Sequence, residues 1–116
     1  MSKRGDREYL RDILTACENI LNYKEGYTFE MFASDTKTQD AIIRNIEIIG
    51  EAVKNISETL KKKYPNIEWK EIAKTRDKLI HSYFGVDLEV VWDIANVDIP
   101  RLMEKIKEII DIEKFN

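Results

Sequence analysis

The chain has 116 residues, of which 43% are hydrophobic and 35% charged, and it contains four glycines and two prolines. This profile predicts one compact domain over residues 1–116 and excludes disordered, collagen-like and sheet-rich proteins. The formal net charge of −3 argues against a protein that coats nucleic acid non-specifically, but it leaves room for a local basic cleft.

The sequence also predicts a soluble, cytoplasmic protein. The charged amino terminus lacks the apolar segment of an export signal, and no apolar stretch is long enough to cross a bilayer. Cys17 is the single cysteine, so it cannot form an internal disulfide. It falls on an apolar helical stripe, which favours a small core residue over a reactive thiol.

The first predicted helix runs from about Asp6 to about Lys24 and ends at Gly26. Apolar residues recur along it at steps of three and four, which marks one buried face. They are Leu10, Ile13, Leu14, Cys17, Ile20 and Leu21. A short helical turn around Phe29 and Phe32 should pack back onto the core.

The second predicted helix is long, starting after Ser34 and Asp35, either of which can cap it, and running to about Lys63. Its apolar stripe has heptad spacing and consists of Ile42, Ile46, Ile49, Val53, Ile56 and Leu60. Such a seam suits a central bundle helix, a helix–helix dimer interface, or both.

Pro65 and Asn66 end that helix and start the third, with Asn66 as its N-cap and Gly85 as its stop. The apolar side of the third helix consists of Trp69, Ile72, Ala73, Leu79 and Ile80. Asp87 then caps a short helix that contains Leu88, Val90, Val91 and Trp92.

Asp98 and Pro100 open the last helix. Its stripe consists of Leu102, Ile106, Ile109 and Ile110. No stretch alternates with a period of two, so we expect no sheet. Long helices joined by short connections predict an all-α, antiparallel helical bundle.

One residue interrupts the apolar side of the third helix. Position 76 continues the stripe but holds Arg76, whose charge must be paired or must open onto a cleft. His81, the only histidine, follows five residues later, and Tyr83 two residues after that. The surrounding stretch is the most basic of the chain, with Lys61, Lys62, Lys63, Lys70, Lys74 and Lys78 against Glu68, Glu71 and Asp77.

Each of these three residues also has a purely structural interpretation. A histidine near a helix C-terminus often only complements the helix dipole. An inward arginine is often half of an ion pair, here with Asp77, Glu47 or Glu51, and Tyr83 can be a core aromatic. The joint Arg-x4-His-x-Tyr spacing favours a functional site.

This spacing resembles a known family. The segment from Arg76 to Tyr83, Arg-Asp-Lys-Leu-Ile-His-Ser-Tyr, is similar to the Arg-x4-6-His signature of HEPN domains and closer still to the Arg-x4-His-x-Tyr form of HepT-type toxins. The upstream segment from Ile43 to Ala52 resembles the other typical segment of that group, and the order of helices fits over nearly the whole chain.

The resemblance implies a HEPN-like fold and a homodimeric, metal-independent RNA endonuclease whose cleft forms between two protomers. RNA carries its own nucleophile, the 2′-OH, so the enzyme needs a base, an acid and a cation for the phosphorane. His81 would be the base or acid, and Arg76 would bind phosphate oxygens. Arg76 and His81 lie about 140° apart on an ideal helix, which also favours a contribution from a second chain.

The resemblance also implies a partner. HepT-type toxins are silenced by an MntA-type nucleotidyltransferase that transfers AMP onto the motif tyrosine, which is Tyr83 here. The RNA substrate, messenger or tRNA, is left open.

We expect no metal and no bound cofactor, because ligand spacings and glycine-rich phosphate loops are lacking. Glu47 and Glu51 are more consistent with ion pairs to Arg44, Lys54 or Arg76 that shape the cleft, and Asp77 belongs to the same group of supporting residues.

Two further interpretations compete with the enzyme. The chain could be a non-catalytic helical partner of a nucleotidyltransferase, or a plain dimerisation bundle built on the seam from Ile42 to Leu60.

Overall fold

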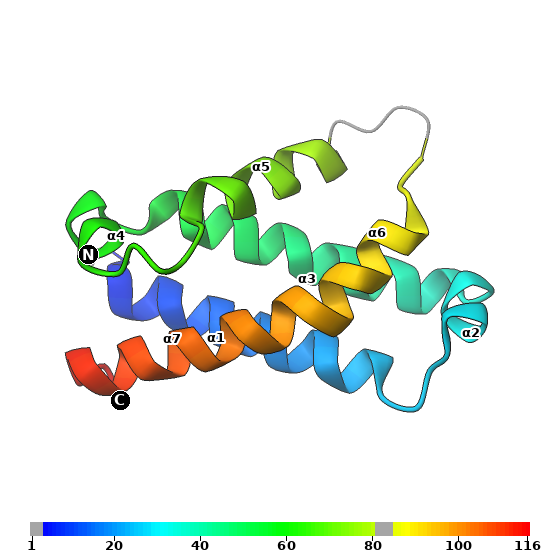
Figure 1. The fold of residues 1–116 in the computed structure, drawn as a ribbon, viewed down its shortest axis with the longest axis horizontal. Helices are drawn as coiled ribbons and strands as arrows, with labels where there is room; N and C mark the ends of the chain where they lie inside the picture. The colour runs from blue at the N-terminus through cyan, green and yellow to red at the C-terminus, as the bar shows by residue number, and fades with distance from the viewer. Residues whose placement is uncertain (1–3, 81–84) are drawn as a thin grey trace.

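The computed structural model describes residues 4–80 and 85–116, and the described residues form helices and connections without a strand. The elements in chain order are α1 (Asp6–Lys24), α2 (Phe29–Ala33), α3 (Thr36–Asn55), α4 (Glu58–Lys63), α5 (Trp69–Ile80), α6 (Leu88–Asp93), the π-helical turn η1 (Ile94–Asp98) and α7 (Ile99–Glu113). Figure 1 shows that the long helices lie roughly alongside one another. The predicted all-α bundle is confirmed.

Helix α3 is the centre of the bundle, with α1 on one side and α5 on the other, and α7 packs against α1. The predicted stripes of α3 and α7 are buried in this core, as are Leu10, Ile13, Cys17 and Ile20 of α1. The seam from Ile42 to Leu60 is therefore covered by the chain itself. The interpretation of that seam as a dimer interface was wrong, because none of its six residues is more than 5% exposed.

Both described ends of the chain lie at one end of the bundle (Figure 1), and Arg7 Nε of α1 donates to Phe115 O at 3.1 Å. None of the described helices is long and apolar enough to cross a membrane.

The second predicted helix is broken in two, which corrects the continuous helix expected up to Lys63. Helix α3 ends at Asn55, and Ser57 caps α4 by accepting from Leu60 N at 3.2 Å. Asp6 of α1 holds the break, since its carboxylate accepts from Ser57 N at 2.8 Å and from Ser57 Oγ at 2.6 Å. The break thus depends on a contact between residues far apart in the sequence.

The start of the third helix was also predicted too early. Helix α5 begins at Trp69, so Asn66 is not its N-cap. Residues 65–67 form a turn that is closed by Ile67 N donating to Tyr64 O at 3.3 Å, and Trp69 Nε1 donates to the same carbonyl at 3.1 Å. The carbonyl of Asn66 instead accepts from Lys105 Nζ of α7 at 2.8 Å.

The last two predicted helices are joined through η1, so Asp98 does not open a separate helix. Ile99 N donates to Ile94 O, five residues back, and Ile94 and Ile99 keep helical dihedral angles. Pro100 follows at once, and a proline has no N–H and its ring would clash with the carbonyl four residues earlier. A wider turn before the proline relieves that clash and lets the chain stay helical.

Two other predicted boundaries are confirmed, the end of the first helix at Gly26 and the cap at Asp87. Gly26 and Gly85 have φ values of 77° and 94°, a left-handed conformation that favours glycine. That Gly85 stops the third helix stays a prediction, because residues 81–84 lie outside the described residues. Asp87 caps α6 by accepting from Glu89 N at 3.0 Å and from Val90 N at 3.4 Å.

Candidate functional site

Arg76 lies where α5 crosses α3 at Gly50. A Cβ atom added to Gly50 would stand 2.1 Å from Arg76 Cβ and 2.5 Å from Arg76 Cγ. The stem of Arg76 therefore rests directly on the backbone of α3, and glycine is the residue that leaves room for it. The side chain is 23% exposed, which confirms that the arginine points inward and still reaches solvent.

Charged groups from α3 and α5 surround the guanidinium. Arg76 Nη2 lies 3.0 Å from Glu51 Oε2, and Nη1 donates to Asp77 Oδ1 at 3.1 Å. Lys54 Nζ contacts the same Asp77 oxygen at 2.5 Å. We call Arg76, Asp77, Glu51 and Lys54 the Arg76 cluster, which contains two cations and two carboxylates.

The electrostatics of this cluster follow from its contacts. Lys54 first, and then Arg76, hold the pKa of Asp77 below its usual range, so Asp77 is ionised near neutral pH. Arg76 Nε is buried and finds no hydrogen-bond acceptor within the part of the chain that the structure describes. The guanidinium is thus fixed by its two terminal nitrogens.

The structure brings together only some of the residues predicted for the site. Arg76, Asp77 and Glu51 are in contact, as predicted. Arg44 and Glu47 form their own pair at 4.0 Å, one turn or more before Glu51 on α3. His81 and Tyr83 lie outside the described residues.

Lys54 was considered only as an ion-pair partner of Glu47 or Glu51, whereas the structure pairs it with Asp77. Lys54 lies one helical turn after Gly50, on the side of α3 that meets α5, and nothing in the sequence alone signals that crossing.

A basic hollow adjoins the Arg76 cluster between α4 and α5. It has a volume of about 680 Å³ and shares Lys54 with the cluster. Its charged lining consists of Lys54, Lys61, Lys62, Lys70, Glu58, Glu68 and Glu71. Over residues 51–80 as a whole, eight lysines and arginines stand against five aspartates and glutamates, although the chain is acidic overall. In the lining of the hollow itself, four lysines stand against three glutamates, so the basic excess there is one charge.

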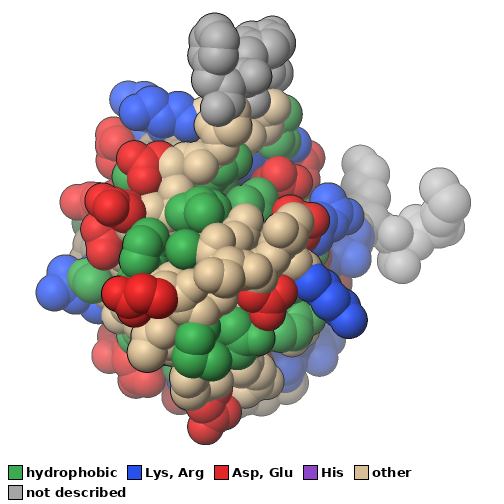
Figure 2. All heavy atoms as spheres, turned by 90° about the vertical axis from the view of Figure 1, so that its right-hand side faces the viewer, with side chains coloured by type: hydrophobic (Ala, Val, Ile, Leu, Met, Phe, Trp, Pro, Cys, Tyr) green, Lys and Arg blue, Asp and Glu red, His purple; other side chains and the backbone are tan. Residues whose placement is uncertain are grey.

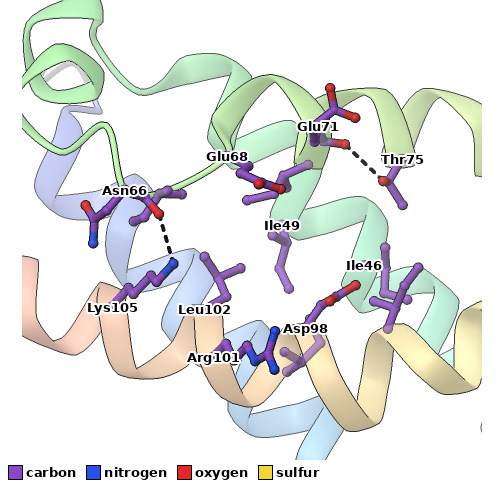
Figure 3. A pocket seen from close by; sticks show the side chains of 14 residues that line it. Ile46, Ile49, Asn66, Glu68, Glu71, Thr75, Asp98, Arg101, Leu102 and Lys105 are labelled. Atoms are coloured by element: carbon purple, nitrogen blue, oxygen red, sulfur yellow. Dashed lines mark hydrogen bonds between the residues drawn. The ribbon is translucent and has the colours of Figure 1, made fainter.

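A second concavity, a groove of about 280 Å³, lies on another side of α5, between that helix and the η1–α7 segment. Figure 3 shows Ile46, Ile49 and Leu102 at its floor, with Glu71 and Thr75 on one rim and Asp98 and Arg101 on the other. Arg76, the one residue predicted for catalysis that lies within the described part of the chain, does not line this groove.

Cys17 is buried, and burial raises the pKa of its thiol to about 12, with Glu18 adding to the shift. The core interpretation of Cys17 is confirmed. Across residues 4–80 and 85–116, no three histidines, cysteines, aspartates or glutamates are grouped so that they could hold a metal ion.

Comparison with known proteins agrees with the resemblance seen in the motif. The family "Ribonuclease HepT-like" matches residues 13–109. A protein of Thermococcus cleftensis named "Probable ribonuclease HepT" is 49% identical over 92% of this chain and 97% of its own length. A protein of Methanocaldococcus jannaschii named "Putative RNase" is 47% identical over 97% of this chain and 94% of its own length.

No solved structure matches the chain. The family match covers most of the sequence, and both relatives align over nearly their full length. The chain therefore belongs to the HepT-like ribonuclease family, whose HEPN-type fold is all-α.

Proposed function

We propose that this chain is a metal-independent endoribonuclease toxin that acts as a homodimer in the cytoplasm and cuts RNA with Arg76 and His81. The observation that carries the proposal is the fixed guanidinium of Arg76. Two carboxylates orient it at the start of the Arg-x4-His-x-Tyr motif, and its side chain remains partly exposed.

The proposed reaction needs only groups that RNA and the protein supply. A base removes the proton from the 2′-OH, the 2′ oxygen attacks the neighbouring phosphorus, and the bond to the 5′ oxygen breaks as an acid protonates that oxygen. The products are a 2′,3′-cyclic phosphate and a 5′-OH. Arg76 would neutralise the charge on the non-bridging oxygens, and His81 would transfer protons near neutral pH.

A homodimer would supply the second proton-transfer group. Each chain has one histidine, so the same residue of a second protomer is the simplest partner for His81. Apolar side chains that such an interface could cover are exposed, including Val90 at 49%, Val97 at 46% and Ile80 at 42%. Figure 2 views the end of the molecule that carries α2 and α6, where apolar side chains gather in patches between charged ones.

The basic hollow supports RNA as the substrate. The hollow shares Lys54 with the Arg76 cluster, and its lysines on α4 and α5 would contact phosphates farther along the RNA chain. Messenger and tRNA substrates both fit this description, because phosphate contacts carry no sequence information.

The proposed control of the toxin is AMP transfer to Tyr83 by an MntA-type nucleotidyltransferase antitoxin. A nucleotide attached seven residues after Arg76 would place a tethered phosphate where RNA phosphate should bind. Incubating the chain with the partner and ATP should add the mass of one AMP to wild type and none to Tyr83→Phe. Modification of Tyr23 or Tyr27 instead would contradict this assignment.

The ribonuclease itself is tested by cleavage of total RNA and purified tRNA in EDTA. Wild type should leave 2′,3′-cyclic phosphate ends, and His81→Ala should lose activity while keeping its helical content and its mass in solution. Lys107→Met, on the exposed face of α7, serves as a matched surface control and should cleave like wild type. Equal cleavage by wild type and His81→Ala would overturn the proposed role of His81.

One observation keeps a second function open. Both terminal nitrogens of Arg76 are already engaged by carboxylates, which is also the arrangement of a structural ion pair. Under that alternative the chain is a non-catalytic helical partner of the nucleotidyltransferase. A dimeric, unmodified wild type that cuts neither RNA yet binds the nucleotidyltransferase would favour it.

A further inference from the structure

The Arg76 cluster poses an electrostatic problem for a phosphate site. Arg76 carries one positive charge and lies between the carboxylates of Glu51 and Asp77. These three groups together carry a net negative charge, which would repel a phosphodiester. A fourth charged group is therefore needed if this arginine is to bind RNA.

We propose that Lys54 is a positioning residue of the phosphate site, which binds Asp77 and prevents the cluster around Arg76 from carrying a net negative charge. This inference rests on the proposed function for its ligand, the backbone phosphate of RNA. The inference adds a residue of α3 to the site of the Arg-x4-His-x-Tyr motif, which begins on α5 at Arg76.

The geometry fits this role. Lys54 Nζ approaches Asp77 Oδ1 to 2.5 Å, closer than the 3.1 Å contact of Arg76 Nη1 with the same oxygen. Lys54 thus neutralises much of the negative charge of Asp77, which would otherwise be balanced by Arg76 alone. Its one-turn spacing from Gly50 places it beside the point where the two helices touch.

A role in holding the fold together explains the pair less well. The side chains of Lys54 and Asp77 are 36% and 45% exposed, and ion pairs at such exposure add little stability. Within residues 4–80 and 85–116, the charged groups that face Asp77 are Lys54 from α3 and Arg76 from its own helix, and Glu51 contacts Arg76. Removing Lys54 should therefore change the charge of the site much more than its folding.

The test measures RNA binding and cleavage separately. Binding uses a short fluorescein-labelled 2′-O-methyl RNA, which lacks the nucleophile and cannot be cut, titrated at several salt concentrations. The proteins are wild type, Lys54→Met, Lys54→Arg and the double variant Lys54→Met/Asp77→Asn, with Lys107→Met as the control for losing a surface charge. Unmodified RNA is cleaved in parallel, and urea unfolding verifies that each variant folds.

Lys54→Met should weaken binding roughly three- to tenfold, and this loss should shrink as the salt concentration rises, because salt screens the repulsion from the uncompensated carboxylate. Lys54→Arg should restore binding because it keeps the charge. The double variant should also recover much of it, since Arg76 and Glu51 alone are neutral together. A purely structural role of Lys54 predicts instead that binding rises and falls with the unfolding free energy of each variant.

The inference is overturned if Lys54→Met binds like wild type and Lys107→Met, or if the double variant binds no better than the single one. The two proposals can fail separately. Wild type that binds the 2′-O-methyl RNA but cuts no RNA contradicts the nuclease, and the binding series still decides the role of Lys54. Wild type that binds no RNA overturns both.

Discussion

Gly50→Ala is the substitution for which the structure makes the sharpest prediction. The new Cβ would stand 2.1 Å from Arg76 Cβ and 2.5 Å from Arg76 Cγ, and optimal carbon–carbon contacts are about 3.5–4.0 Å. The two helices must therefore move apart by roughly 1.5 Å at this point. Helix α5 packs mainly against α3, so it can shift as a unit.

Two opposing terms set the size of the effect. Alanine is favoured over glycine in a helix interior by about 1 kcal/mol, and overpacking a tight contact costs about 1–3 kcal/mol. We expect the free energy of unfolding to fall by about 1 kcal/mol, which for a chain of this length lowers Tm by roughly 5 °C. The displaced Arg76 should also lose its contact with Glu51. The rate of RNA cleavage should therefore fall by more than the loss of folded protein alone would cause.

Urea unfolding and RNA cleavage of Gly50→Ala measure these two effects. The control is a double-mutant cycle with Arg76→Gly, which removes the Cβ and Cγ atoms that the new methyl group would meet. The stability lost in Gly50→Ala/Arg76→Gly should be smaller than the sum of the single losses, and Arg76→Ala should give no such relief because it keeps its Cβ. A raised unfolding free energy for Gly50→Ala, or no relief in the double variant with Arg76→Gly, would refute the close contact between α5 and α3.

Three further predictions concern the rest of the bundle. Lys63, and then Tyr64, lower the pKa of Glu113, so the stability lost in Glu113→Gln should be largest near neutral pH and should shrink as the pH falls below 4.5 in urea titrations. Cys17 should react with a thiol reagent only as fast as the chain unfolds. Asn45→Ala should lower the unfolding free energy measured in urea by about 1–3 kcal/mol, because the side-chain oxygen of buried Asn45 accepts from the side-chain amide of Asn19 on α1.

Local patterns predicted the regular parts of this fold well. The limits of α1 and the cap at Asp87 follow from spacing and residue type alone, because they depend on neighbours within a few positions. The break between α3 and α4 does not follow from local patterns, since it involves a contact between Ser57 and Asp6, which lie 51 positions apart in the sequence. The π-helical turn was missed for a related reason, because Pro100 can either start a helix or be accommodated inside one.

The part of the candidate site that lies on α5 could be predicted from the sequence. Arg76 was singled out because it interrupts an apolar stripe, and its contacts with Asp77 and Glu51 agree with that analysis. The position of Lys54 opposite Asp77 could not be read from the sequence, because it depends on where α5 crosses α3. The heptad seam was overinterpreted, since the same spacing serves a core helix and a dimer interface.

The crossing of α3 and α5 at Gly50 links the upstream segment to the motif of the HepT-like family. A residue with a side chain at position 50 would push α5 away and displace Arg76 from its present 3.0 Å contact with Glu51. Glu51 and Lys54 are placed one and four positions after that contact, so the same crossing that seats the arginine also supplies its counter-charge and the cation that balances Asp77. The position and pairing of Arg76, and the net charge of the groups around it, thus depend on one turn of α3, which explains in physical terms why a site on α5 requires the sequence upstream of it.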